Sequence, residues 1–373
     1  MRILSLVTLV TPTGDYGGPL RVAVNQAQAL RERGHEVTLV AGQRGFAGRP
    51  PSEVGGVPAK LFPVRRLAPR TGFAGLSAPR MIRHLVRDLG EYDVVHVHLA
   101  RDLITLPAAL LARRQRVPYV LQCHGMIDAS TALLARAGDP LLTRPALAGA
   151  CRVLYLTPTE QQDLAALLPS TDKLEHLPNG VPPAGRTADP TEPEVLYLAR
   201  LTARKRPGLV VDVADALQEE FPQVRYRIVG PDEGEAAPVQ AAIARSRADV
   251  LWEGPLDPAR TLDRMSRAGI FVLPSVDEPY PMSVLEAMAV GLPVVVTDTC
   301  GLAPLVTRTG AGLVVDAGTE SLVAAVRSLL ADPASADQMG RRGQQTAREE
   351  LGMSAIADTL ESIYASCANQ AGG

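Results

Sequence analysis

The chain has 373 residues, 46% of them apolar, and its 38 Lys and Arg against 40 Asp and Glu give a formal net charge of −2. This length is typical of two domains. The apolar content excludes intrinsic disorder, and the balanced charge excludes proteins that hold nucleic acid through a strongly basic surface. Four widely spaced cysteines (Cys123, Cys151, Cys300, Cys367) without a C-x-x-C motif favour reduced thiols over disulfides or a zinc site.

Short apolar runs alternate with amphipathic stretches in the first half of the chain. The expected strands are Ile3–Val10, Val37–Ala41, Val94–His98 and Tyr119–Cys123, and the expected helices are Leu20–Arg33, Pro79–Leu89 and Leu103–Arg114. Unbroken apolar runs are typical of strands that are buried on both faces. The β-α-β order therefore predicts a doubly wound α/β domain with a parallel sheet.

The same pattern restarts after a Pro-rich, polar segment, Pro182–Pro193, which we interpret as a linker. The second series has strands at Glu194–Ala199, Arg225–Val229, Val250–Trp252, Ile270–Pro274 and Pro293–Thr297, and helices at Leu209–Glu220, Val239–Arg247, Thr261–Ala268, Ser283–Ala289, Ser321–Ala331, Ala336–Glu350 and Ile356–Ser366. Two α/β domains across a cleft are predicted, with ligands beyond the carboxyl ends of the strands.

The most specific stretch is Asp277–Val296, DEPYPMSVLEAMAVGLPVVV, which follows a predicted strand. Glu278 and Glu286 lie eight residues apart in it, with a helix start between them. In one interpretation, Ser283 and Glu286 form a capping box. In the other, the amides and positive dipole end of the helix hold a ligand phosphate, while Glu278 bonds sugar hydroxyls and Glu286 a ribose.

This stretch resembles the E-x7-E motif of retaining family 4 glycosyltransferases of the GT-B fold, with Glu278 and Glu286 as the two acids. Pro281 stands where the family usually has Gly, and Tyr280 replaces Phe, so the sugar pocket is expected to differ in shape. The resemblance covers nearly the whole chain. It implies an acceptor domain (1–183), a linker (184–193), a nucleotide-sugar domain (194–353), a helix that crosses back (354–368) and a flexible tail (369–373).

A second motif, LARLTARK at Leu198–Lys205, resembles the family's G-R-L-x-x-x-K. By this resemblance Arg200 and Lys205 hold the donor diphosphate, which gains negative charge as the glycosidic bond breaks. Taken alone, such a pair is more typical of a solvated face. The resemblance also implies phosphate, sugar or nucleotide contacts at Met282, Ser283, Val284, Gly230 and Gly254.

Two glycines, Gly17 and Gly18, follow the first strand, where they permit close approach of a ligand. The G-x-G-x-x-G fingerprint of dinucleotide binding is absent, and a plain tight turn is the alternative. The resemblance places these glycines at the sugar and diphosphate, and Tyr16 on the acceptor side.

Three histidines end two neighbouring strands. His96 and His98 share one strand face, as metal ligands do, but no third ligand is apparent. His124 resembles the family's strand-end histidine beside the donor sugar, with a purely structural histidine as the alternative. We expect His98 on the acceptor side.

The resemblance implies a metal-independent transfer of sugar from a nucleotide-diphosphate-sugar, UDP- or GDP-linked, to a hydroxyl of a sugar, lipid-linked or small-molecule acceptor, with no further cofactor. No D-x-D motif is present. Polysaccharide or glycoconjugate biosynthesis is the expected setting. The alternatives are a non-hydrolysing nucleotide-sugar epimerase of the same fold and a non-catalytic sugar-binding protein, which would need a signal peptide.

Charge is uneven between the halves. Residues 1–180 carry 21 basic and 14 acidic side chains, a net +7, which leaves 17 and 26, a net −9, for the rest. Solvated helix faces explain this distribution, and so does docking to an anionic membrane or to an anionic acceptor. No apolar run is long enough for a membrane span, and no cleavage site follows Met1–Val10, so we expect a cytoplasmic protein, with peripheral attachment to the inner face of the membrane as an option.

Overall fold

The computed structural model describes residues 1–12, 17–67, 74–127, 139–184 and 193–371. The chain divides into two compact units. Unit 1 comprises Met1–Gly180 together with Met353–Gly373, and unit 2 comprises Val181–Gly352. Val181 belongs to unit 2 because its amide donates to the Leu351 carbonyl at 2.8 Å. The boundary therefore lies three residues before the expected one at 183.

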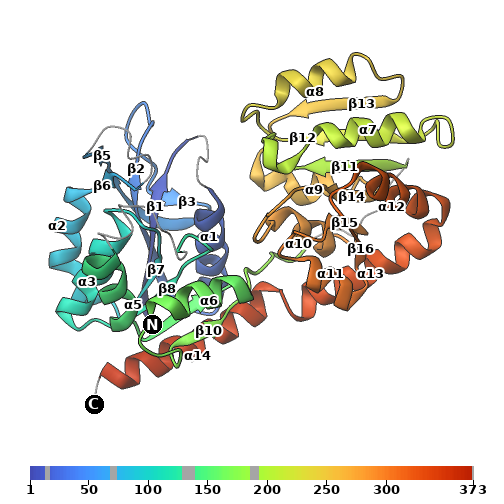
Figure 1. Ribbon diagram of the computed structural model, residues 1–373. Coiled ribbons are helices and arrows are strands. Elements are labelled where there is room, and N and C mark those ends of the chain that lie inside the picture. The colour runs from blue at the N-terminus through green and yellow to red at the C-terminus, as the bar shows by residue number, and fades with distance from the viewer. Residues whose placement is uncertain (13–16, 68–73, 128–138, 185–192, 372–373) are drawn as a thin grey trace. The chain divides into compact units, whose positions relative to one another are not determined.

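Unit 1 is built on an eight-stranded sheet with the order β10-β9-β8-β7-β1-β2-β4-β3, parallel except for the β3–β4 pair (Figure 1). Its strands are β1 (Arg2–Val10), β2 (Glu36–Gln43), β3 (Glu53–Val54), β4 (Val57–Pro63), β7 (Val94–His98), β8 (Tyr119–Gln122), β9 (Arg152–Tyr155) and β10 (Leu174–His176), with a separate hairpin of β5 (Arg65–Arg66) and β6 (Leu76–Ser77). Its helices are α1 (Gly17–Glu32), α2 (Pro79–Asp88), α3 (Thr105–Gln115), α5 (Arg144–Gly149), α6 (Pro158–Leu167) and α14 (Met353–Ala371).

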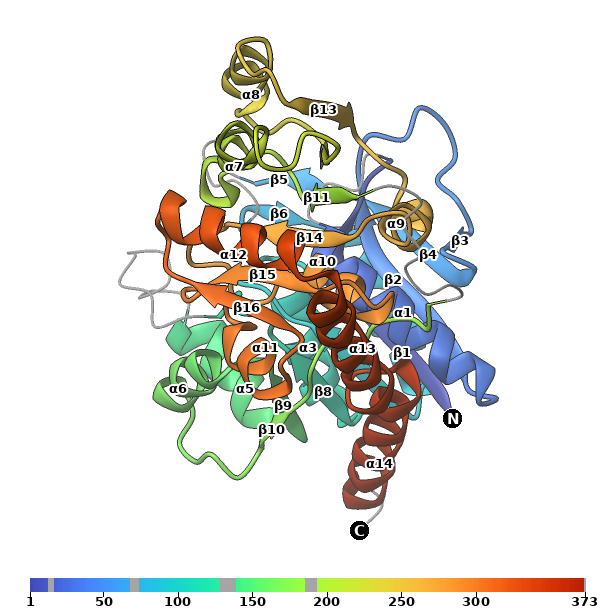
Figure 2. The same cartoon turned by 90° about the vertical axis from the view of Figure 1, so that its right-hand side faces the viewer.

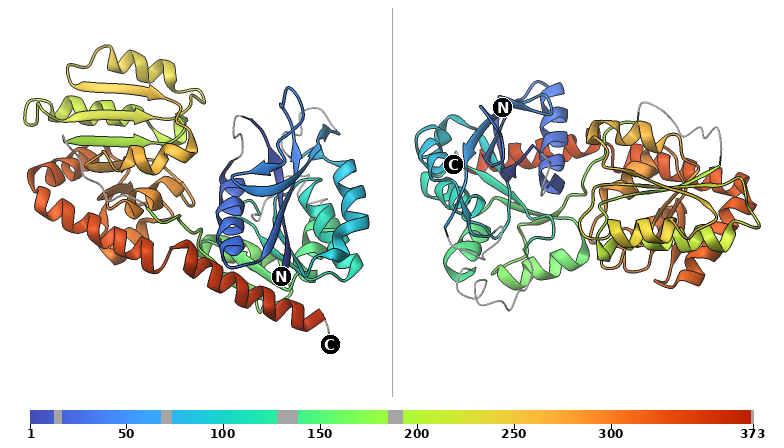
Figure 3. Two further views of the ribbon diagram at one scale, coloured as in Figure 1. Left: turned by 180° about the vertical axis from the view of Figure 1, so that it is seen from behind. Right: turned by 90° about the horizontal axis from the view of Figure 1, so that it is seen from above.

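Helices cover both faces of this sheet (Figure 3). Alternate side chains of β1 enter different clusters: Leu4 and Leu6 pack with α2, α3 and α5, whereas Ile3 and Val7 pack with α1 and α14. This period of two explains why β1 reads as an unbroken apolar run. Helix α14 therefore completes the core of unit 1, although it comes last in the sequence.

Unit 2 has a six-stranded, all-parallel sheet in the order β13-β12-β11-β14-β15-β16 (Figure 2). The strands are β11 (Glu194–Leu198), β12 (Arg225–Val229), β13 (Asp249–Gly254), β14 (Ile270–Leu273), β15 (Val294–Thr297) and β16 (Gly312–Val315). The helices are α7 (Gly208–Leu217), α8 (Ala236–Ile243), α9 (Thr261–Met265), α10 (Met282–Ala289), α11 (Ala303–Thr309), α12 (Thr319–Ala331) and α13 (Pro333–Glu349).

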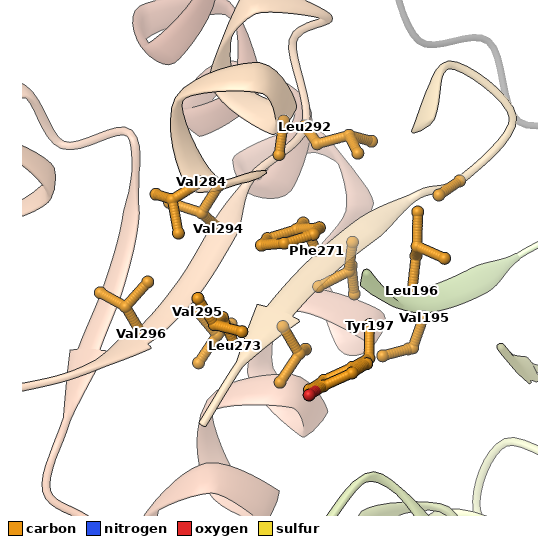
Figure 4. Close-up of a cluster of buried hydrophobic side chains, with 14 of the residues drawn as sticks. Val195, Leu196, Tyr197, Phe271, Leu273, Val284, Leu292, Val294, Val295 and Val296 are labelled. Atoms are coloured by element: carbon orange, nitrogen blue, oxygen red, sulfur yellow. The ribbon is translucent and has the colours of Figure 1, made fainter. Parts of the chain in front are cut away.

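The core of unit 2 is built from the central strands, whose Tyr197, Phe271 and Val295 are buried together with Val284 of α10 (Figure 4). The strand order reverses between β11 and β14. In doubly wound sheets ligands bind beyond the carboxyl ends of the strands at such a switch point. The loops after β11 and β14 are therefore the place to look for a site.

The predicted α/β class with two parallel-sheet domains is confirmed. Two details differ. The capping-box interpretation is wrong, because α10 begins at Met282 after Pro281 and has no side-chain cap, so Ser283 is already inside the helix. Helix α14 continues to Ala371, so residues 369–371 are helical and not a tail. Of the expected linker 184–193, only Ala184 and Pro193 lie within the described residues.

Candidate functional site

An ion pair joins the two predicted motifs of unit 2. Lys205 Nζ lies 3.1 Å from Glu278 Oε2, and both side chains are nearly buried, at 9% and 11% exposure. Arg204 Nη2 lies 3.3 Å from the same oxygen and is about half exposed. Burial lowers the pKa of Lys205, and the charge of Glu278 opposes that shift. Two cations therefore converge on one carboxylate at the switch point between β11 and β14.

Backbone hydrogen bonds hold the Glu278 loop against the loop after β11 and the loop after β15. The Val276 amide donates to the Arg204 carbonyl at 3.0 Å, and the Gly301 amide donates to the Glu278 carbonyl at 2.8 Å. Asp277 has a left-handed backbone with φ of 50°, an uncommon conformation for a residue with a side chain. Such local strain persists where the surroundings fix it, which is common at functional sites.

Helix α10 begins directly after this loop. Its N-cap is Pro281, which makes no side-chain hydrogen bond to the helix, and Met282 and Ser283 are half-buried there. Val284 packs into the core, while its amide bonds the Pro281 carbonyl at 3.1 Å. Glu286 is buried one turn further on. An uncapped helix start next to two cations is suited to a phosphate group.

Arg200 pairs with a different carboxylate, although its charge still contributes to the lowered pKa of Lys205. Its guanidinium is 52% exposed and forms an ion pair with Glu233, which accepts from Nη1 at 2.8 and 2.9 Å. Sequence reasoning selected Arg200 but missed Arg204 and Glu233. The sequence could have identified Arg204, because Arg204 lies beside Lys205 in the same motif.

Gly230 and Gly254 end two neighbouring strands of unit 2. Gly230 has φ of +148°, and a Cβ there would collide with the Ala199 carbonyl. Gly254 has φ of +81° with open space around it, and its carbonyl accepts from the Gly230 amide at 2.8 Å. Only glycine tolerates the Gly230 position, which holds the end of β12 against the loop after β11.

In unit 1, His96, His98 and His124 form a stack of parallel rings, which we call the histidine stack. The ring centroids are 4.5 Å apart between His96 and His98, and 5.1 Å apart between His98 and His124. His98 Nδ1 lies 2.8 Å from His124 Nε2, and His98 Nε2 lies 3.4 Å from Ser5 Oγ. Tyr364 of α14 bonds His96 Nδ1 at 2.7 Å.

The His98–His124 contact couples the proton positions along the stack. Burial lowers the pKa of both rings, that of His124 to about 3, so each is neutral at pH 7 and carries one N–H. If Ser5 donates to His98, then His98 donates to His124, and His124 presents an N–H at Nδ1. If Ser5 accepts, every direction reverses, and His124 presents a lone pair at Nδ1. Ser5 and His98 thereby set the tautomer of His124.

The placement of His98 bears on its expected role. The residue is 1% exposed, and both ring nitrogens already have protein partners. Its acceptor-side role stays a prediction, and the contacts make it a support for His124. His124 is half-buried and has φ of 52°, directly before Gly125 at 70°. Two successive left-handed residues turn the chain sharply after β8.

Gly17 and Gly18 are the first residues of α1, and a Cβ at Gly18 would meet no atom within 4 Å. Packing within unit 1 therefore does not require glycine at position 18. Tyr16 lies outside the described residues. Within the described ranges, His, Cys, Asp and Glu side chains form no group of three that would hold a metal ion. None of the described helices combines the length and apolar character that crossing a bilayer requires.

Two family models match the chain. Residues 184–346 match the model "Glycosyl transferases group 1", and residues 17–180 match "Glycosyl transferase 4-like domain". The two matches correspond closely to unit 2 and to unit 1 without α14. The phosphate-suited cluster lies in the first of these matches and the histidine stack in the second.

Named proteins are similar over nearly their full length. A D-inositol 3-phosphate glycosyltransferase of Kineococcus radiotolerans is 30% identical, with 94% of this chain and 91% of that protein covered. An alpha-maltose-1-phosphate synthase of Mycobacterium tuberculosis is 27% identical, with 79% and 85% covered. Anabaena HepE in complex with UDP-glucose has the same fold, with a TM-score of 0.74, 19% identity, and 98% and 100% of the chains covered.

Proposed function

Because the chain belongs to the group 1 glycosyltransferases with the GT-B fold, we propose that it transfers a sugar from a nucleotide-diphosphate-sugar to an acceptor hydroxyl with retention of the anomeric configuration. The observation that carries the donor assignment is the cluster of Arg204, Lys205 and Glu278 at the uncapped start of α10. The setting would be the biosynthesis of a glycan or glycoconjugate.

The cluster fits the charge change of such a reaction. As the glycosidic bond breaks, the leaving diphosphate gains negative charge, and fixed cations stabilise it more than they stabilise the intact donor. Lys205 in the free protein is engaged by Glu278. When the donor binds, its diphosphate would take over Lys205 and Arg204, and Glu278 would turn to sugar hydroxyls. These cations would do the work of a metal ion, and we propose a metal-independent reaction.

His124 would bond a hydroxyl of the donor sugar in the same reaction. Its neutral ring has one nitrogen occupied by His98, so Nδ1 is left for the substrate. The tautomer set through Ser5 then decides whether that hydroxyl must donate or accept. For the acceptor hydroxyl we propose front-side attack, in which the departing phosphate oxygen takes its proton.

The donor base and sugar are best identified by a thermal-shift panel of UDP-, GDP-, ADP- and TDP-sugars. A true donor present at about 100 times its Kd stabilises the protein by about 2.7 kcal/mol, which a melting curve resolves. Transfer is then measured as acceptor-dependent release of nucleotide, with D-inositol 3-phosphate among the acceptors because the similar protein from Kineococcus is named for it. Epimerised donor in the absence of acceptor would refute transfer as the activity.

Two substitutions test the residues. Lys205→Ala and Glu278→Gln should each lower kcat by about 100-fold or more, the usual effect of removing one group that stabilises the transition state. Lys60→Ala is the matched control, because Lys60 is exposed on β4 and outside the cluster. Normal turnover in Lys205→Ala would remove this residue from the diphosphate site. A strict requirement for added metal would refute the metal-independent reaction.

We further propose that unit 1 docks peripherally to anionic lipid through α2. Arg80, Arg83 and Arg87 are exposed on this helix, and Val86 between them is 51% exposed. Basic side chains around an exposed apolar one are typical of a helix at a membrane surface. The protein should sediment with phosphatidylglycerol vesicles and not with phosphatidylcholine vesicles. Equal sedimentation with both would refute the proposal.

A further inference from the structure

Unit 1 contains a cavity at the amino ends of β8 and β9. A cavity of about 310 Å³ opens there between the end of α3, the end of α5 and α14. His98 ends β7, and His124 follows the end of β8, so both histidines lie at the opposite, carboxyl ends of these strands. The cavity is therefore separate from the histidine stack, and no step of the proposed transfer uses it.

Four cations and no acidic residue line the cavity. The cations are Arg113, Arg116, Arg152 and Lys173. Arg152 is paired with Glu175 at 3.3 Å. Among the described residues no carboxylate pairs with the other three. A small concave space thus holds a local excess of about three positive charges, which low-dielectric walls concentrate.

Two of these cations also stabilise the fold, but this role explains only part of the positive charge at the cavity. Arg113 Nη1 donates to the Pro145 carbonyl at 3.0 Å, and Lys173 Nζ donates to the Ala148 carbonyl at 2.6 Å. Both carbonyls belong to α5, and cations near the end of a helix interact favourably with its dipole. These carbonyls bear no net charge, so the two cations stay uncompensated. Within the described part of the chain, the Arg116 side chain has no such carbonyl partner. Its backbone at the end of α3 is left-handed, with φ of 59°.

Two cysteines at the cavity interact with each other and with its cations. Cys151 and Cys367 both line it, and their thiols are hydrogen-bonded to each other. That bond, together with the charges of Arg152 and Lys173, lowers the pKa of Cys151 to about 7 despite partial burial. Burial instead raises the pKa of the thiols of Cys123 and Cys300. The contact between Cys151 and Cys367, together with burial, raises the pKa of Cys367, so only the contributions of Arg152 and Lys173 at Cys151 report the positive charge of the cavity.

We propose that the cavity binds a small phosphate-bearing anion, either inorganic phosphate or the phosphate monoester of a small metabolite, at a site distinct from the donor and acceptor sites. Three guanidinium groups and one ammonium group match the oxygens of a phosphate dianion, and guanidinium groups bind it with two parallel hydrogen bonds. The volume is at the lower end of the range for small-ligand pockets, which fits a small metabolite.

Cys151 serves as a reporter inside the cavity. The full-length protein is alkylated with neutral iodoacetamide near pH 7, and the Cys151 peptide is quantified by mass spectrometry over time. As phosphate fills the site, we expect the alkylation rate to fall about fivefold to tenfold relative to chloride of equal ionic strength. Glucose should have no effect. Protection by glucose 6-phosphate at lower concentration than by inorganic phosphate would assign the metabolite as the ligand.

Arg116→Asn is the test variant, because Asn tolerates the left-handed backbone. Arg114→Asn is its matched control: Arg114 is also exposed, two residues earlier in the last turn of α3, but does not line the cavity. We expect the protection to be lost in Arg116→Asn and kept in Arg114→Asn. The proposal is overturned if phosphate protects no better than chloride, or protects all three proteins equally.

Phosphate can also bind at the donor site, so a second measurement compares melting temperatures in phosphate and chloride. Binding at the donor site raises the melting temperature of both variants alike. Only the additional shift in Arg114→Asn over Arg116→Asn belongs to this cavity. If Cys151 resists alkylation in every buffer, the difference in melting-temperature shift between the two variants is the deciding measurement. Equal shifts in both variants would then overturn the proposal.

Discussion

The ion pair between Lys205 and Glu278 gives the sharpest prediction about unit 2. We consider the variants Lys205→Met and Glu278→Gln and their combination, which together form a double-mutant cycle. Methionine keeps the length of the lysine stem, and glutamine keeps the shape of the glutamate. The cycle therefore isolates the charge interaction across the 3.1 Å contact.

The magnitude follows from distance and burial. At 3.1 Å and an effective dielectric constant of about 20, Coulomb's law gives about 5 kcal/mol of attraction between unit charges. Desolvation of two nearly buried groups offsets several kcal/mol of this. We expect a coupling energy of about 1–3 kcal/mol. Lys205→Met alone should cost about 2–3 kcal/mol, less than for an isolated buried pair, because Arg204 stays at 3.3 Å from the carboxylate.

The protein contains its own probe for this experiment. Trp252 is the single tryptophan of the sequence, and it lies on β13 in unit 2, where its Nε1 donates to the Gly230 carbonyl at 3.0 Å. Its fluorescence during urea unfolding therefore reports the unit that contains the pair. The four proteins are compared by the free energy of unfolding obtained from that signal alone.

Two results would refute the reasoning. A coupling energy below about 0.5 kcal/mol would mean that the contact does not persist in solution. A Lys205→Met variant more stable than the wild type would mean that desolvation outweighs the attraction. Either result would also weaken the proposal that Lys205 waits, paired, for a diphosphate.

Further predictions concern the histidine stack and one glycine. Burial holds the pKa of His96 and His124 at about 3, below the unfolded value of about 6.5. Unfolding therefore takes up protons between these two pH values. The free energy of unfolding should fall as the pH decreases from about 6.5 toward 3, by up to about 1.4 kcal/mol per pH unit for each ring. Urea unfolding across that range measures it; His96→Gln should lower the slope by about one proton, and an unchanged slope contradicts the assignment. Gly301→Ala should destabilise unit 2 by about 1–3 kcal/mol, because its Cβ would meet the Pro279 carbonyl, whereas Gly208→Ala, in open space, should not; equal midpoints of Trp252 fluorescence would count against this. Tyr364→Phe leaves the buried His96 Nδ1 without its 2.7 Å partner and should cost about 1–3 kcal/mol, and a calorimetric melting curve identical to the wild type would speak against that bond.

Sequence patterns predicted the regular parts of both sheets well. The strands at Val94–His98 and Arg225–Val229 have the predicted bounds, because unbroken apolar runs between polar turns are what a parallel sheet requires. Sequence patterns predicted no helices or strands between Asp139 and His176. Its helix α5 has six residues and β10 three, too few for either periodicity to emerge, whereas the ten-residue α6 was missed despite its length.

The candidate site was predictable residue by residue but not in its pairing. Motifs selected Lys205 and Glu278, yet nothing local shows that residues 73 apart form an ion pair, because the contact depends on how two loops meet. The partner of Arg200 was missed for the same reason. The contact of Tyr364 could not be predicted either, since Tyr364 bonds a histidine 268 residues earlier in the chain.

The return of α14 to unit 1 has a consequence for how the protein is made. Met353, Ile356, Leu360 and Ile363 of this helix fill the same apolar cluster as Ile3 and Val7 of the first strand. On the ribosome, the part of that face which α14 covers stays exposed beside α1 until the last few dozen residues have been added, while unit 2, which is contiguous, can fold first. The half that is synthesised first is thus completed last, and a nascent chain halted before residue 353 would expose an apolar face to the cell's chaperones.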